Sequence, residues 1–100
     1  MLADAKSFAD FAEKLGATEL PDLLEAAAAY ASCVEGRPHF SRPQIMRSAT
    51  SIAEGDVSRE ASMRSFGMLL RQGKIQKIKR GQFAISETSH FLPQARKAAK

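Results

Sequence analysis

The chain has no tryptophan and only one cysteine and one tyrosine among its 100 residues. Cys33 alone cannot form an internal disulfide, and in an alanine-rich stretch a cysteine is normally a small core residue. No apolar run approaches the roughly 20 residues that a membrane-spanning helix requires, so we expect no membrane partner. Residues 1–16 lack a basic stretch followed by an apolar block, and we therefore expect no signal peptide and a cytoplasmic location.

Residues that carry catalytic or metal chemistry are also sparse. His39 and His90 lie far apart in the sequence, and neither is at metal-ligand spacing from the other or from Cys33. Helical carboxylates such as Asp22 and Glu25 are spaced for a solvated face, and there is no glycine-rich phosphate loop or nucleophile elbow. We therefore expect no metal, no cofactor and no enzymatic activity.

Charge is distributed unevenly along a chain of otherwise globular composition. At 44% hydrophobic and 26% charged residues, 100 residues are enough for one small core. Residues 1–36 carry two basic and seven acidic side chains, net −5, whereas residues 37–100 carry 13 basic and four acidic ones, net +9. Such asymmetry indicates a polyanion-binding face, because Lys and Arg set against phosphates release condensed counterions. A solvated basic surface is the alternative.

Apolar periodicity predicts three helices in the first half of the chain. They span about residues 3–15 (ended by Gly16), 18–35 (capped by Thr18, with Pro21 in the first turn) and 41–51 (capped by Ser41, ended by Gly55). The second helix is expected to bury a stripe of leucine, alanine and valine. Between the second and third helices, Gly36, Pro38 and Pro43 break helical structure on either side of His39-Phe40.

The segment from Ser58 to Ser86 has the most informative pattern, a helix followed by a glycine stop and a basic hairpin. Ser62, Phe66, Leu69 and Leu70 share one helical face, and Arg64, Gly67 and Arg71 lie on the opposite one. Ser58 is a good N-cap, and Gly73 can take the left-handed conformation that ends a helix. Arg80-Gly81, flanked by Ile75 and Ile78 and by Phe83 and Ile85, predicts an antiparallel hairpin.

Gly73 is preceded by Leu69 and Leu70 and followed by Ile75, Ile78, Gly81 and Phe83. This spacing resembles the recognition helix and wing of the winged helix-turn-helix superfamily. The resemblance covers about residues 21–86. It implies a mainly α fold with a small β-hairpin wing and one or two extra N-terminal helices. It also implies a short strand at His39-Phe40 that joins the wing sheet, with Phe40 pointing inward. The corresponding division is residues 1–16 as an appended amphipathic helix, 17–90 as the winged-helix domain and 91–100 as a basic tail or linker. Phe91 and Leu92 are expected to dock on the core.

In this superfamily the recognition helix usually enters the DNA major groove and the wing touches the backbone or minor groove. The resemblance thus assigns DNA contact to the helix at about residues 58–72 and the wing at 74–85, with these candidates: Arg59, Arg64, Ser65, Gly67, Arg71, Lys74, Lys77, Lys79, Arg80 and Gln82. Arg64 is placed to bind guanine O6 and N7 together, and Arg59 to clamp a phosphate. Strand alternation puts Lys77 and Lys79 opposite Ile78, away from the core, where edge protection is an alternative role.

The presence of a glycine at position 67, inside the predicted helix, has two possible explanations. A glycine inside a helix costs up to about 1 kcal/mol relative to alanine. Either DNA or another partner approaches the helix closely at this point, or another helix of the domain packs tightly against it.

Two functions therefore remain. The first is a DNA-binding winged-helix domain, a small bacterial-type transcriptional regulator with double-stranded DNA as its partner. The alternative is a winged-helix protein interaction module that binds a protein partner through the acidic first helices, the Met63 and Met68 surface or the basic face. The N-terminal helix, with Phe8, Phe11 and Leu15, either pairs two subunits as a homodimer or covers the back of the domain. Cover is favoured, because 100 residues leave little apolar area to spare.

Overall fold

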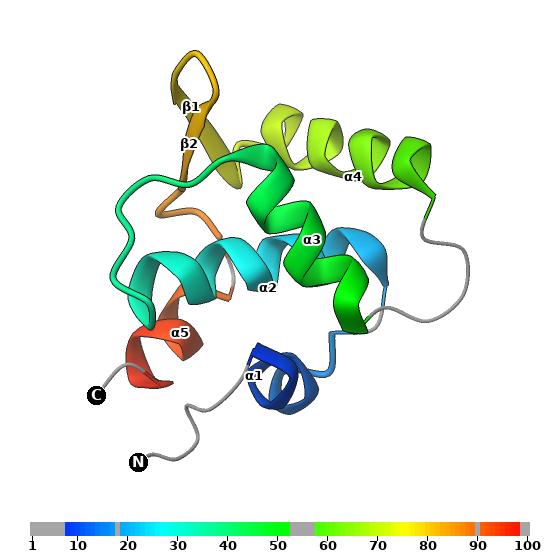
Figure 1. Ribbon diagram of the computed structural model, residues 1–100. Coiled ribbons are helices and arrows are strands. Elements are labelled where there is room, and N and C mark those ends of the chain that lie inside the picture. Colours follow the sequence, from blue (N-terminus) through cyan, green and yellow to red (C-terminus); the bar gives the residue numbers. More distant parts are fainter. Residues whose placement is uncertain (1–7, 18, 53–57, 90, 99–100) are drawn as a thin grey trace.

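The computed structural model describes residues 8–17, 19–52, 58–89 and 91–98. These residues form helices α1 (Phe8–Leu15), α2 (Leu20–Cys33), α3 (Arg42–Ile52) and α4 (Arg59–Arg71), strands β1 (Ile75–Lys79) and β2 (Gln82–Ile85), and helix α5 (Leu92–Ala98) (Figure 1). The prediction of a mainly α chain with a small β-hairpin is confirmed. No helix in these ranges is long and apolar enough to cross a membrane.

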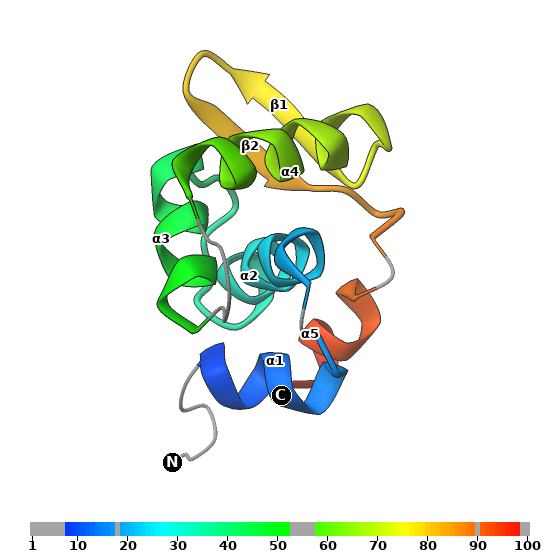
Figure 2. The same ribbon diagram turned by 90° about the vertical axis from the view of Figure 1, so that its right-hand side faces the viewer.

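Helix α2 is the centre of the fold. The other four helices and strand β2 pack around it, as the view in Figure 2 shows. All nine residues from 23 to 31 are buried, so the predicted stripe is only part of its buried surface. The reason is the run of alanines at 26–29 and Ala31, whose small side chains let neighbours approach from every side.

The helix ends follow the predicted chemistry at several points. The Oγ atoms of Ser41 and Ser58 accept hydrogen bonds from the backbone N–H groups of Gln44 (3.3 Å) and Ala61 (3.1 Å), and both N-cap predictions are confirmed. Gly73 ends α4 with φ +76°, the left-handed conformation that glycine adopts at little cost. The expected start of the first helix, the Thr18 cap and the Gly55 stop lie outside the described residues.

The sheet consists of β1 and β2 with one additional bridge. Ile75 pairs with Ile85 and Lys77 with Phe83, and a bulge separates Lys77 from Lys79. The Phe40 N–H donates to the Phe83 carbonyl and the Phe83 N–H donates to the Phe40 carbonyl, both at 2.8 Å. The short strand predicted at His39-Phe40 is therefore present as a single bridge, with Phe40 buried as expected.

The prediction that Ile78 faces the core and Lys77 points away from it is wrong. Ile78 is 44% exposed, because it follows Lys77, the partner of Phe83, and alternation therefore puts it on the sheet face opposite the buried ring. Lys77 is paired with Phe83, and directly paired residues share a sheet face, so Lys77 does not point to the side opposite the buried ring. Lys77 and Lys79 are nevertheless exposed, as expected, since the hairpin projects beyond the helices (Figure 1).

Two peripheral helices cover α2 on the side away from the hairpin. The rings of Phe8 and Phe11 pack against Tyr30, with centroids 5.8 and 5.4 Å away, which is the covering arrangement favoured for the N-terminal helix. The expected docking of Phe91 and Leu92 is confirmed, since both are buried. The residues after them, expected only as a tail or linker, continue into α5.

Candidate nucleic-acid interface

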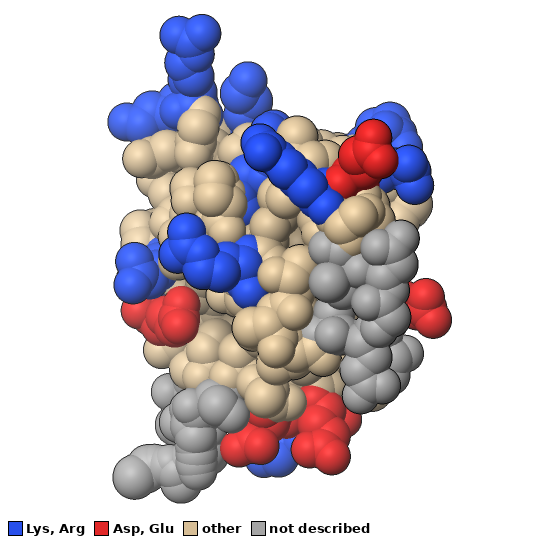
Figure 3. All heavy atoms as spheres, turned by 45° about the vertical axis from the view of Figure 1, so that its right-hand side comes forward, with Lys and Arg blue, Asp and Glu red and all other residues tan. Residues whose placement is uncertain are grey.

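Helix α4 and the β1–β2 hairpin lie at the same end of the molecule (Figures 1 and 2). Six exposed cations project from these two elements, and we call them the basic surface: Arg59, Arg64, Arg71, Lys77, Lys79 and Arg80. Figure 3 shows Lys and Arg gathered at this end, whereas several Asp and Glu side chains lie at the opposite end. The charge asymmetry of the sequence is therefore also an asymmetry in space.

The position of α4 relative to the hairpin is fixed by an aromatic pair. Phe66 of α4 is 1% exposed, and its ring meets the ring of Phe83 edge to face, with centroids 5.0 Å apart. The guanidinium of Arg42, in the first turn of α3, lies 5.4 Å from the Phe66 centroid and 5.6 Å from that of Phe83. These contacts join α3, α4 and the hairpin, because the face of an aromatic ring attracts both a cation and the edge of another ring.

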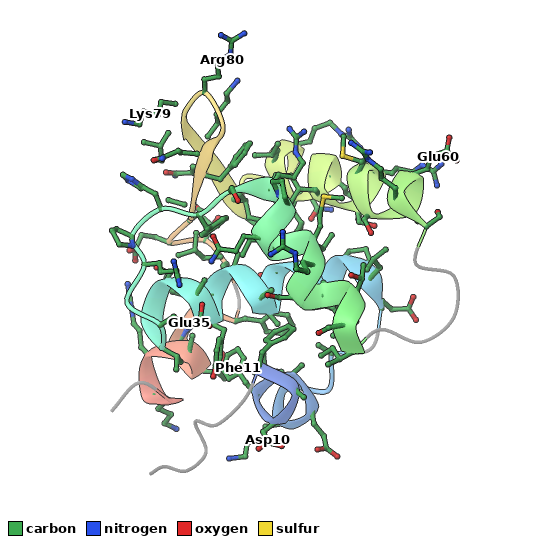
Figure 4. The ribbon with its side chains drawn as sticks, in the orientation of Figure 1. Asp10, Phe11, Glu35, Glu60, Lys79 and Arg80 are labelled. Carbon is green, nitrogen blue, oxygen red and sulfur yellow. The ribbon has the colours of Figure 1, made fainter. Side chains whose placement is uncertain are left out.

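The outward face of α4 agrees with the predicted face. Arg59, Arg64 and Arg71 are exposed, and Ser65 is half-buried at the edge of this face. Met63 is 40% exposed and therefore lies at the surface of α4. Glu60 is also exposed, at the far end of α4 from the hairpin (Figure 4). A carboxylate in the first turn interacts favourably with the helix dipole, which gives Glu60 a reason to be there.

Gly67 has no packing neighbour that requires it. A Cβ atom built on its backbone would meet only Nη1 of Arg71, at 3.9 Å, an ordinary van der Waals distance. The explanation by tight packing of another helix of the domain is therefore wrong for the described residues. Close approach of a binding partner is the explanation that remains.

The wing tip carries its cations away from the body of the protein. Figure 4 shows Lys79 and Arg80 extending outward at the end of the hairpin. Gly81 closes the turn with φ +76°, and Gln82 beside it is exposed. The tip thus combines charged and neutral donors with a position that has no side chain.

Lys74 differs from the other predicted cations, because it has a partner inside the protein. Its Nζ lies 3.7 Å from Oε1 of Glu25, a carboxylate of α2 that is only 1% exposed, and its own side chain is 29% exposed. The Ser89 hydroxyl donates to the other oxygen of Glu25 at 2.7 Å. This cluster ties the start of the wing to α2 and gives Lys74 a carboxylate partner, which the six cations of the basic surface lack among the described residues. The expectation of a solvated face is wrong for Glu25, because this carboxylate is buried.

No ion pair among the described residues joins any of the six cations of the basic surface to a carboxylate. The cations that do form such pairs are Arg37 with Glu35, Lys74 with Glu25 and Arg96 with Glu87. An unpaired guanidinium or ammonium keeps its full charge and all its donors for a ligand. The basic surface is thus suited chemically to bind an anion.

The His, Cys, Asp and Glu side chains of the described part of the chain are scattered. This part contains no group of three or more His, Cys, Asp or Glu side chains that could hold a metal ion. Burial raises the pKa of the Cys33 thiol, which keeps the thiolate scarce near neutral pH. A hollow of about 360 Å³ beside α1 is lined by mostly apolar residues: Ala9, Ala12, Glu13, Gly16, Ala17, Leu23 and Ile52.

Comparisons with known proteins give no relative for this chain. No protein-family model, no curated protein and no solved structure matches it.

Proposed function

We propose that this chain is a DNA-binding winged-helix domain that acts as a small transcriptional regulator. The observation that carries the proposal is the placement of six unpaired cations from α4 and the wing at one end of the molecule. The element order also supports it. Helix α2, the Phe40 bridge, α3, α4 and the hairpin follow one another as the first helix, short strand, helix-turn-helix and wing of that superfamily do.

In the proposed complex, α4 lies in the major groove of duplex DNA, whose width of about 12 Å admits a helix. Arg64, in the middle of the outward face, reads base edges, and the wing cations contact phosphates. Phosphate contacts set the register and orientation of the protein, whereas base contacts set the sequence preference. The rigid link through Phe66 and Phe83 holds helix and wing in a fixed relation for both tasks.

Binding of random duplex DNA at two salt concentrations tests the proposal. Five phosphate contacts, one for each cation of the basic surface other than Arg64, predict that affinity falls by about 500-fold between 50 and 200 mM salt, because the released counterions must be taken up again when DNA dissociates. Fluorescence anisotropy with a labelled duplex of about two helical turns measures both affinities. The absence of binding at 50 mM salt, or an affinity that does not depend on salt, would contradict the proposal.

Replacement of Arg64 with alanine is expected to remove base readout. On the preferred site, selected from a random pool, the loss of a bidentate contact to guanine costs about 1 to 3 kcal/mol, with a smaller loss on random DNA. The matched control is Arg96→Ala, which removes the same charge from α5, on the other side of α2 from the basic surface (Figure 2). Equal losses on selected and random DNA would refute base readout by this side chain.

A protein interaction module is the second candidate, and one observation favours it. The two large hydrophobic side chains most exposed among the described residues, Met63 and Ile78, lie on α4 and the wing, the same elements that carry the basic surface. Exposed methionine adapts well to protein partners. The two candidates differ in the salt titration, because a protein module without DNA binding gives no complex with the duplex at 50 mM salt.

A further inference from the structure

We infer that Gly67 is the point where the backbone of α4 comes closest to DNA, so that any side chain at this position weakens binding. The inference rests on the proposed DNA-binding function and adds the geometry of contact to it. Its starting point is the sequence position, because glycine lies here in the interior of a 13-residue helix, where it is the least favourable residue after proline.

The described part of the fold gives no reason for this glycine. Among the described glycines, those with positive φ are 16, 36, 73 and 81, so Gly67 has an ordinary helical backbone that alanine adopts equally well. The space where a Cβ would lie is open except for the Arg71 guanidinium at 3.9 Å. Alanine at this position would therefore strengthen the helix without any clash inside the described part of the protein.

The neighbours of Gly67 on the helix surface are the cations of the basic surface. Arg64 lies three residues before it and Arg71 four residues after it, and side chains at these spacings are adjacent on one helical face. The missing side chain thus leaves a notch in α4 with a guanidinium on each side. Arg71 already lies over this notch, which places a positive charge at its opening.

A notch between two guanidinium groups fits an anionic surface that presses against the helix. The phosphates and base edges of a DNA groove form such a surface, and both arginines reach them best when the helix axis lies deep in the groove. Charge attraction rises as distance falls, so a side chain that holds α4 away weakens the neighbouring contacts as well as its own.

Two variants, Gly67→Ala and Gly67→Leu, test the inference with side chains of different size. Both residues favour helix, so the midpoint of denaturant unfolding is expected to stay equal or rise. Affinity for the same random duplex at 50 mM salt is expected to fall by about tenfold for alanine and about a hundredfold for leucine, losses comparable to one and two base contacts. The control variant is Ser51→Ala, at an exposed position of α3. Alanine favours helix there as well, but this substitution should not change the affinity for DNA.

The outcomes separate this inference from the proposed function. If the parent chain binds DNA and Gly67→Ala binds equally well, the inference is wrong and the proposed function stands. If Gly67→Ala lowers the unfolding midpoint, the glycine is needed by the fold, and the inference is also wrong. If the parent chain does not bind the duplex at all, the proposed function fails, and the inference fails with it.

Discussion

Phe66→Ala is expected to lower the free energy of unfolding by about 3 to 5 kcal/mol, the usual cost of removing a buried phenylalanine side chain. The ring is almost fully buried and has neighbours on two other elements, since it packs on Phe83 of β2 and lies under the Arg42 guanidinium of α3. These neighbours cannot collapse into the cavity without moving the hairpin relative to α4. A domain of this size has only about 5 to 15 kcal/mol of stability, so the variant should unfold at a much lower denaturant concentration.

Urea titration followed by far-UV circular dichroism measures this loss. Met63→Ala on the same helix is the control, because its side chain is among the most exposed apolar ones and should change stability by less than about 1 kcal/mol. A Phe66→Ala variant as stable as the control would mean that the aromatic pair does not hold α4 to the wing.

The second large effect concerns the wing. Simultaneous replacement of Lys77, Lys79 and Arg80 with alanine is expected to reduce the salt dependence of DNA binding by about three units of slope. If parent and variant bind DNA equally at 1 M salt, a slope change of this size corresponds to a loss of about 10⁴ in affinity at 50 mM salt, which lies about 1.3 decades lower. Folding should not change, because all three side chains are exposed and form no ion pair within the described residues.

A second triple variant separates the placement of charge from its total. Replacement of Arg37, Arg96 and Lys97 with alanine removes the same net charge from exposed positions outside α4 and the wing. Anisotropy titrations of both variants should show a large loss only for the wing variant. Equal losses would show that overall charge, and not the wing, determines the affinity.

The features of the fold that sequence could predict are those governed by neighbours along the chain. Ser41 and Ser58 cap helices because a hydroxyl at that position reaches the free N–H groups of the first turn. Gly73 and Gly81 mark chain reversals because their φ angles are unfavourable for other residues. Helical periodicity likewise identified the buried and exposed faces of α4, including its three arginines.

The features that sequence did not predict depend on packing between distant segments. The exposure of Ile78 depends on which residue of β1 pairs with Phe83, and the alternation of one strand does not contain this register. The ion pair of Lys74 joins it to Glu25, 49 residues earlier in the chain, so its charge looked like part of the basic wing. Apolar periodicity gave no indication of the packing role of Arg42, because its guanidinium contacts two rings that belong to α4 and β2.

Phe83 makes contacts through both its backbone and its ring, and these contacts anchor the wing. Its backbone pairs with Lys77 on one edge and Phe40 on the other, and its ring packs on Phe66. The hairpin is therefore anchored to the rest of the fold at this residue, whereas residues 78–82 beyond it are all exposed. In the proposed complex, the wing would pivot about Phe83, and its tip would adjust to grooves of different width while α4 keeps its position.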